Sequence, residues 1–383
     1  MDLRLSIHDS IHLVRRSDWE GVANEAALYL CYDLLSALED AMAGSMTFRY
    51  AVFHDGNYRP VGIACFQILD LEDNGSAYGE GVRNLGSGIG SRIIKDLKVR
   101  SLVCGNVFHC GDHGAHFNRE IGREEQLRAL EMAMEQLRAD ERLDPKVSVL
   151  IFKDLWPGRA NETTVLDHHG YHPLAMDVDM VMHIDPEWKN MAGYVEALTS
   201  KARTRINAIL GRSIALEIKE LSASEIQHSI PLLQGLFDDV LERSPFIFGR
   251  LNVAVYAQWK ALLGDKLLFH GFYLNGELIG FSAAFVLGDT LDAQYVGIDH
   301  SRNRQHGIYQ RMLVHLLEVA IHKGLCHINF GRTAEQTKST IGAEPVGMLF
   351  YVKHRNRLAN RVIGPFVRKV RPSGFEQRSP FRN

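Results

Sequence analysis

The residues best suited to binding or chemistry lie between 299 and 309, where a strand-like run ends and an amphipathic helix begins. The start of a helix exposes backbone N–H groups that lack partners within the helix, and it carries partial positive charge. Such a start can hold a phosphate or a pyrophosphate. Gly307 would let a bulky anion approach the backbone, and Arg302 and Arg304 would add positive charge. The alternative is an ordinary junction between a loop and a helix with surface arginines.

Hydrophobic periodicity predicts the elements around this segment. In the second half of the chain, strands are expected at 267–274, 277–287, 291–298, 326–330 and 347–353, with a helix whose apolar face includes Ile308, Met312 and Leu316. The first half carries a weaker copy of this order, with helices at 24–43 and 123–139 and strands at 47–54, 61–69, 99–108, 147–152 and 176–184. Two related domains would suit a chain of 383 residues.

This order of elements resembles the GNAT acyltransferase fold. The residues Arg304-Gln305-His306-Gly307-Ile308-Tyr309 resemble its acyl-CoA signature, Arg/Gln-x-x-Gly-x-Gly/Ala, although Tyr309 departs from the final small residue. The pattern Leu-x-x-Lys-x-Arg-x-x-Ile at 198–206 is similar to the segment that joins the tandem domains of FemAB and BioF2-like acyltransferases. Phe330-Gly331-Arg332, Lys338 and Gly342-Ala343 are similar to the ending of that group.

The resemblance implies an α+β fold with mixed, mostly antiparallel sheets and flanking helices, arranged as two tandem GNAT-like (acyl-CoA N-acyltransferase) domains. We expect a first domain at 1–187, a basic linker helix at 188–212, a second domain at 213–355 and a basic tail at 356–383.

The same resemblance implies an N-acyltransferase that moves an acyl group from acetyl-CoA or another acyl-CoA to an amine of a small molecule or peptide. Strands 291–298 and 326–330 would splay apart to admit the pantetheine, and Arg304, Gln305, His306, Gly307, Ile308 and Tyr309 would hold the cofactor. One alternative is a FemAB-type transferase that uses aminoacyl-tRNA. The other is a degenerate GNAT domain that binds a ligand without catalysis.

Four side chains are candidates for roles at that site. Tyr309 is a possible general acid for the leaving thiolate, with a packed tyrosine as the alternative, and Asp292 is a possible base, with an exposed hairpin carboxylate as the alternative. Arg332 and Lys338 would hold an acidic substrate or the 3′-phosphate of the cofactor, unless they are simply solvated.

A loop rich in histidine occupies residues 109–116 of the first half. The spacing His-Cys-x-x-His-x-x-His matches no familiar zinc framework, so we expect no metal. His113 is a candidate base and His109 a candidate substrate ligand, because histidine titrates near neutral pH. A structural role, with the histidines bonding loop carbonyls, is the favoured alternative. Gly86-Ser87-Gly88-Ile89-Gly90 lacks the Lys-Ser/Thr of a phosphate loop.

Composition limits the remaining possibilities. The net charge is −3 and the five cysteines are scattered. Residues 1–19 contain charges throughout and no apolar core of signal-peptide length, and no window approaches the roughly 18–20 apolar residues of a spanning helix. We therefore expect a cytoplasmic protein. From Lys353 to Asn383, nine residues are Lys or Arg and only Glu376 is acidic. This tail is a candidate for peripheral contact with an anionic membrane or with tRNA, or it is a solvated end.

Overall fold

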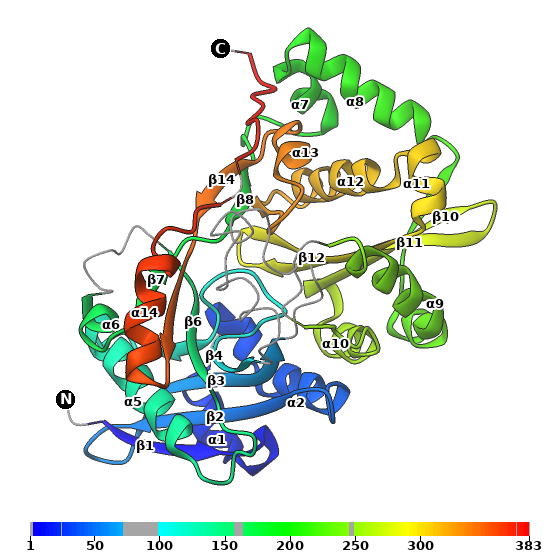
Figure 1. Ribbon diagram of the computed structural model, residues 1–383. Coiled ribbons are helices and arrows are strands. Elements are labelled where there is room, and N and C mark those ends of the chain that lie inside the picture. Colours follow the sequence, from blue (N-terminus) through cyan, green and yellow to red (C-terminus); the bar gives the residue numbers. More distant parts are fainter. Residues whose placement is uncertain are drawn as a thin grey trace. The chain divides into compact units, whose positions relative to one another are not determined.

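The structure is a computed structural model that describes residues 3–23, 25–71, 99–156, 164–244, 249–372 and 374–382. The glycine-rich segment 86–90 lies outside these residues. The chain forms two compact units, each with one sheet (Figure 1). The first unit draws on residues 1–177, 245–251 and 347–373, and the second on residues 178–244, 252–346 and 374–383.

The sheet of the first unit has the order β1-β2-β3-β4-β6-β15-β7, with β5 paired to β3. Its pairs are antiparallel except for β4 and β6, which run parallel. These strands are β1 Arg4–His8, β2 Thr47–His54, β3 Pro60–Leu71, β4 Val99–Cys104, β5 Ala115–Phe117, β6 Val149–Leu155, β7 His172–Leu174 and β15 Leu349–His354.

Helices cover this sheet and flank it. They are η1 Ile11–Leu13, α1 Arg16–Glu20, η2 Glu25–Leu30, α2 Tyr32–Ala41, α5 Arg123–Ala139, α6 Thr164–His168 and α14 Arg357–Val367. Helix α5 has the predicted bounds, and its predicted apolar face is buried in the core of this unit, with Leu127, Leu130, Met134 and Leu137. The helix predicted at 24–43 is divided instead into η2 and α2.

The sheet of the second unit has the order β14-β8-β13-β12-β11-β10-β9. Its strands are β8 Val178–His183, β9 Leu216–Glu220, β10 Leu267–Leu274, β11 Glu277–Leu287, β12 Thr290–Ile298, β13 His327–Asn329 and β14 Glu344–Gly347. Its helices are α7 Met191–Ala197, α8 Ser200–Arg212, α9 Ala223–Leu241, α10 Val255–Leu263, α11 His300–His306, α12 Ile308–His322 and α13 Glu335–Ser339, with η4 at Gly264–Lys266. Both strands of the predicted Asn275-Gly276 hairpin have the expected bounds.

The helices of the second unit lie on both faces of its sheet. Alternate residues of a strand point to opposite faces, and His270 on β10 meets His315 of α12 while its neighbour Phe269 meets Tyr256 of α10. On β12, a Cβ atom at Gly297 would meet Leu236 of α9. Helix α12 therefore covers one face, and α9 and α10 cover the other.

Each half of the chain gives one strand to the sheet of the other half. Strand β15 was expected to close the second half, but it lies between β6 and β7 in the first sheet. Strand β8 was expected to close the first half, but it lies between β13 and β14 in the second sheet. Apolar alternation predicts that a strand forms and which face it buries, but it leaves open which strand it pairs with.

The segment expected as a linker helix forms two helices that belong to the second unit. Tyr194 on α7 and Ala202, Ile206 and Ile209 on α8 are buried in its core. A linker between independent domains would be exposed, so these helices are part of the unit and not a spacer.

The end of the chain is also held in place. Phe381 packs against Trp188 and Tyr194, and the amide of Thr199 donates to the carbonyl of Pro380 at 2.8 Å. The last residues of the tail are therefore packed against the second unit and are not a solvated end. Within the described part of the chain, every helix is too short or too polar to cross a bilayer.

The strand exchange makes a testable prediction. Tyr351 lies on β15, late in the sequence, yet its side chain belongs to the core of the first unit. Tyr351→Ala should cost about 3–5 kcal/mol of that unit's stability and speed hydrogen exchange in β6 and β7. The matched control is Phe330→Ala, because Phe330 is buried in the second unit and should affect β12 and β13 instead. Faster exchange in β12 after Tyr351→Ala, with β6 unchanged, would contradict the exchange of strands.

Candidate functional site

The second sheet contains a fork between two parallel strands. Strand β12 pairs with β13 only from Thr290 to Asp292, opposite His327 to Asn329. Strand β12 then continues to Ile298, while β13 has ended. The pairing of the two strands thus ends at Asp292, which is where the expected splaying would begin, and β12 continues beyond it without β13.

Strand β12 also carries a β-bulge just beyond the fork. Ser282 of β11 pairs with Val296, and Ala284 pairs with Ala293, so Gln294 and Tyr295 together stand opposite a single residue of β11. A bulge bends a strand and re-aims its side chains, and bulges are common beside active sites. Period-two alternation in the sequence gave no sign of this bulge.

Asp292 lies at the fork itself. Its side chain is buried, with 1% of its surface exposed, and its Oδ2 accepts a hydrogen bond from Gln294 Nε2 at 2.8 Å. The exposed hairpin carboxylate that was the alternative is therefore excluded. Tyr256 of α10 lies nearby, and its pKa is raised well above its usual range by burial first and then by Tyr295 and Asp292. Tyr256 and Gln294 are site residues that the sequence did not indicate.

The loop after β13 has an unusual backbone. Gly331, Thr333 and Ala334 all have φ between 53° and 72°, a region that favours glycine. Non-glycine residues in this region cost of order 1–3 kcal/mol each and persist only where their surroundings hold them. Because such strain concentrates at ligand sites, this loop is a candidate part of the site.

Lys338 holds that loop in place. Its side chain is buried, and its Nζ donates to the carbonyl oxygens of Gly331 at 3.1 Å and Arg332 at 2.5 Å. The solvated surface lysine that was the alternative is therefore excluded, and Lys338 positions the loop, while its role in binding an acidic group stays a prediction. Arg332 is half-buried beside it, and its role in binding an acidic group stays a prediction.

The predicted phosphate cradle differs from expectation. Residues 300–306 form the separate helix α11, so Gln305 and His306 lie in its last turn and their amides point back along it. The Gly307 amide donates to the carbonyl of Asn303 at 2.8 Å, and the Tyr309 amide donates to Asn303 Oδ1 at 3.0 Å. Asn303 thus takes two of the amides that were expected to hold the cofactor, one with its main-chain carbonyl at the end of α11 and one with its side chain at the start of α12.

Ile308 and Gln310 are further residues of the first turn of α12. Amides in the first turn of a helix have no acceptor within that helix, so these two are the candidates for binding a ligand. The turn has no acidic residue and contains Arg311, and Arg212 Nη2 bonds Gln310 Oε1 at 2.6 Å beside Gly307. The helix start is therefore electropositive, but it offers fewer donors than the sequence suggested.

Tyr309 is half-buried and packs against the apolar core on both sides of α12. Burial raises the pKa of its phenol above the usual range, and Glu335 adds to this shift. The raised pKa makes the phenol a weaker acid, so it holds its proton at neutral pH and donates it less readily than an ordinary tyrosine. The packing matches the structural alternative, and the catalytic role stays a prediction.

The histidine loop of the first unit, residues 109–116, is held in place by two buried charged residues of β6. Lys153 and Asp154, at the end of β6, form a fully buried ion pair. Lys153 Nζ donates to the His109 carbonyl at 2.5 Å, and Asp154 Oδ2 accepts from the Gly111 amide at 3.0 Å. The sequence did contain an indication of this pair, because two charged residues stand inside the apolar run 149–155. Hydrophobic periodicity alone did not identify it.

The two candidate histidines pack against one ring. His109 stacks on Tyr29 with ring centroids 3.8 Å apart, and His113 meets the same ring edge-on at 4.8 Å. Burial, followed by the charge of Lys153, lowers the pKa of His113 to about 4. A base with so low a pKa is a poor match for proton transfer near neutral pH. Packing is consistent with the structural alternative, and no group of metal-ligand side chains occurs among the described residues.

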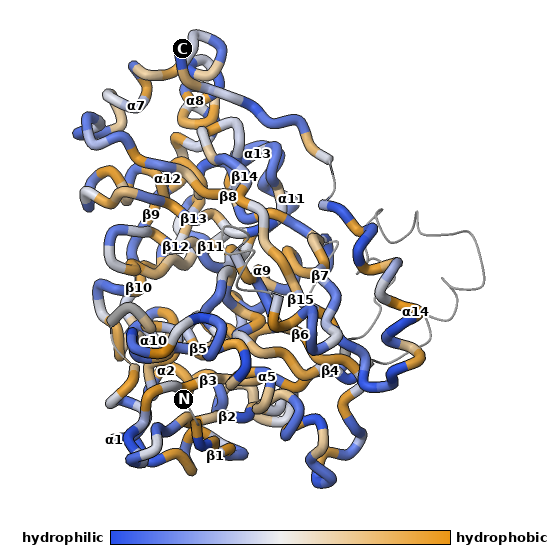
Figure 2. Tube along the Cα trace, turned by 90° about the vertical axis from the view of Figure 1, so that its left-hand side faces the viewer, coloured by the Kyte–Doolittle hydropathy of each residue, from blue (hydrophilic) through white to orange (hydrophobic). Residues whose placement is uncertain are grey.

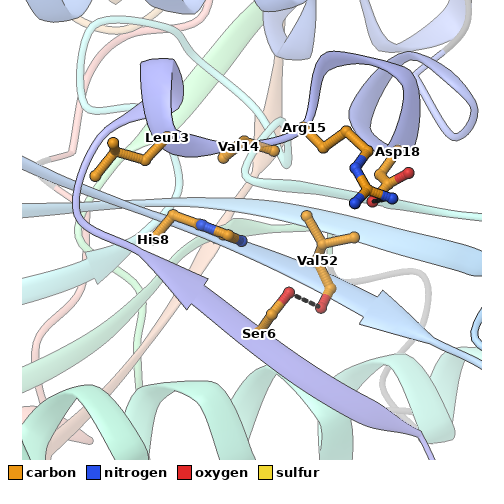
Figure 3. A pocket seen from close by; sticks show the side chains of 7 residues that line it. All are labelled: Ser6, His8, Leu13, Val14, Arg15, Asp18 and Val52. Carbon is orange, nitrogen blue, oxygen red and sulfur yellow. Dashed lines mark hydrogen bonds and ion pairs between the residues drawn. The ribbon is translucent and has the colours of Figure 1, made fainter.

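A pocket of about 410 Å³ lies at the edge of the first sheet, between β1, β2 and the start of α1 (Figure 3). Its lining includes Ser6, His8 and Asp18, the residue types of a hydrolytic triad. The Ser6 hydroxyl donates to the Val52 carbonyl at 3.3 Å, as the dashed line in Figure 3 shows, so its proton is directed away from His8. This pocket therefore lacks the arrangement of an activated serine.

Comparisons with known proteins also indicate the GNAT fold. Residues 240–339 match the family model described as an acetyltransferase (GNAT) domain. No curated protein gives a match to this sequence. FemX is similar in structure, with 9% identity, a TM-score of 0.51 and coverage of 85% of this chain and 92% of FemX.

Two further structures are similar over most of their length. L-PGS from Bacillus licheniformis has 12% identity, a TM-score of 0.50 and coverage of 92% of this chain and 94% of its own. A tandem GNAT protein from the clavulanic acid biosynthesis pathway has 12% identity, a TM-score of 0.48 and coverage of 93% and 99%. With the GNAT match over 240–339 and two mixed, mostly antiparallel sheets, the chain is a tandem GNAT-fold protein that resembles the FemAB-like group.

Proposed function

We propose that the protein transfers an acyl group from acyl-CoA to an amine, with the donor bound at the fork of the second unit. The observation that carries this proposal is the separation of β12 from β13 directly after Asp292. There the ladder between β12 and β13 stops, whereas a continuous ladder would have paired the backbone of β12 with β13 along its length. The bulge at Gln294 and Tyr295 lies on the same stretch of β12.

The residues at the fork suit the proton transfers of this reaction. The amine nitrogen attacks the acyl carbon, the carbon–sulfur bond breaks, and the amine loses a proton while the sulfur gains one. Asp292 would take the proton from the amine, and Tyr309 would give a proton to the sulfur. Good positioning lowers such a barrier by about 7–11 kcal/mol, so these side chains need to supply only part of the rate.

Charge favours the second unit over the first as the donor site. The first turn of α12 has no acidic residue, whereas the first turn of α5 carries Glu124 and Glu125. Carboxylates in a first turn already satisfy the positive end of the helix and repel a phosphate. In the first unit, the buried Lys153–Asp154 pair also holds a loop at the end of β6, where a donor would have to enter.

A second candidate is an aminoacyl transferase that uses aminoacyl-tRNA, as in the FemAB-type alternative. The specific observation in its favour is Asn303, which takes the Tyr309 amide that the pyrophosphate of CoA would use. The basic residues Arg205 and Arg212 on α8 and Arg304 on α11 would suit a larger polyanion.

The cofactor site is tested by ligand-induced stabilisation. Acetyl-CoA at a hundred times its dissociation constant should stabilise the parent by about 2.7 kcal/mol, seen as a rise in Tm. Gly307→Glu should abolish the rise, because it places a carboxylate at the start of α12. The control is Gly324→Glu, at the other end of the same helix, where Gly324 has a similar positive φ of 66°.

Three outcomes would count against this cofactor site. If Gly307→Glu responds to acetyl-CoA as the parent does, the site lies elsewhere. If no acyl-CoA raises Tm but an aminoacylated tRNA minihelix does, the second candidate replaces the first. If neither donor stabilises the protein, the non-catalytic alternative is favoured.

The base is tested by Asp292→Asn, which keeps the size of the side chain and its contact with Gln294. We expect thiol release from acetyl-CoA with a panel of amines to fall by roughly 10²–10⁴-fold, while acetyl-CoA still raises Tm. Asp289→Asn is the control, because Asp289 is exposed at the turn before β12. Full activity in Asp292→Asn would remove Asp292 from the mechanism.

A further inference from the structure

Helix α14 presents an apolar face to solvent. Leu358, Val362 and Phe366 recur every four residues and are 75%, 64% and 51% exposed, and Ile363 beside them is 36% exposed. Large apolar side chains that gather on one exposed face mark an interaction site more often than isolated ones do. Figure 2 shows α14 with alternating hydrophobic and hydrophilic residues along its length.

The orientation of α14 on the first unit is fixed by close packing. A Cβ atom at Gly364 would lie 2.6 Å from the ring of His172, so only glycine allows this approach. Asn360 Nδ2 donates to the Gly170 carbonyl at 2.8 Å, and the His354 amide donates to Asn360 Oδ1 at 2.8 Å. Asn360 and Gly364 therefore face the unit, and the face with Leu358, Val362 and Phe366 points outward.

A basic flank runs beside the apolar face. Arg357, Arg361 and Arg368 fall within a narrow arc of the helix, at spacings of four and seven residues. No acidic residue occurs from 354 to 371, and Arg357 and Arg361 have no ion-pair partner among the described residues. By contrast, the preceding Lys353 is paired with Glu131 and Glu135.

We propose that α14 docks on the surface of an anionic lipid membrane. An amphipathic helix with apolar residues on one face and arginines beside them lies in the interface, with its apolar side chains among the acyl chains. Anionic headgroups would meet Arg357, Arg361 and Arg368. This inference goes beyond acyl transfer and does not depend on the fork.

Other occupants fit the face less well. Residues 374–382 pack within the second unit, where Phe381 meets Trp188, so the end of the chain is not the missing cover. A second copy would bring two basic flanks together. RNA would suit the arginines, but it offers aliphatic side chains such as Leu358 and Val362 no apolar phase, and Phe366 is the only stacking ring on the helix.

The test is co-sedimentation of the full chain with vesicles of phosphatidylcholine, with or without added phosphatidylglycerol. We expect binding only to the anionic vesicles, weakening as salt is raised. Equal binding to both vesicles, or none to either, would overturn the proposal.

Variants of the apolar face separate membrane insertion from simple charge attraction. The triple change Leu358→Asn, Val362→Asn and Phe366→Asn should abolish vesicle binding without lowering Tm, because these side chains are exposed. The control is Ile214→Asn with Leu232→Asn, two exposed apolar residues of the second unit, which should bind as the parent does. If the triple variant keeps full vesicle binding, α14 does not insert.

Variants of the basic flank test the charge. Each arginine near an anionic surface is worth about 1 kcal/mol, so Arg357→Gln with Arg361→Gln should weaken binding roughly 25-fold. Lys146→Gln with Lys201→Gln removes the same charge at two other exposed lysines and should change binding little. Equal losses in both double variants would overturn the assignment to α14.

Two further results would replace the membrane with another partner. tRNA binding that depends on Arg357 and Arg361, together with no binding to vesicles, would identify the face as an RNA surface. Self-association in sedimentation velocity that the triple apolar variant removes, again without vesicle binding, would identify it as an interface between copies. An unaltered Tm in each variant shows that the fold has been kept.

Discussion

Each sheet depends on a strand from the opposite half of the chain. Strand β15 lies between β6 and β7, and strand β8 lies between β13 and β14, so neither is a removable edge. Removing a strand from within a sheet would leave two rows of unpaired N–H and C=O groups. The two halves are consequently bound to fold together, and the long sequence separation of these pairings predicts slow folding.

At the fork in the second sheet, the hydrogen bonds of the β12–β13 ladder end, and nearby side chains form hydrogen bonds with the loop after β13 in their place. Asn329 Oδ1 accepts from the Gly331 amide at 2.8 Å, and Lys338 takes the carbonyls of Gly331 and Arg332. The loop is thus supported by the side chains of Asn329 and Lys338. A buried lysine that donates to two carbonyls of one loop is well suited to holding the backbone of that loop in one shape.

In the first sheet, the parallel strands β4 and β6 also stop pairing, but a buried ion pair follows at that point. Strand β6 continues beyond its last pair with β4, at Cys104 and Phe152, and the charges of Lys153 and Asp154 follow at once. Removing one partner of a buried ion pair leaves an uncompensated charge, so the pair strongly favours the one loop arrangement that satisfies it. Two sheets of the same plan have therefore taken separate roles, one with an open fork and one with a fork held by its own loop.

Local sequence determined the elements that depend on nearby residues. Periodicity predicted β2, β10, β11 and α5 with their observed bounds, and it identified the apolar face of α12. Gly307 was expected to let an anion approach, and the structure shows instead that it is the residue between α11 and α12 with a left-handed backbone. These features are set by interactions within a few residues, so they can be read without the fold.

Tertiary structure decided what those elements do together. The partners of β8 and β15, the bulge at Gln294 and the burial of Asp292 each depend on residues far away in sequence. Even an interaction between residues close in sequence can depend on the fold. Whether the Asn303 side chain caps α12 or leaves the Tyr309 amide to a ligand depends on the formation of α11. Strand pairing and side-chain burial are set by the packing of the whole unit, and a local pattern carries no record of that packing.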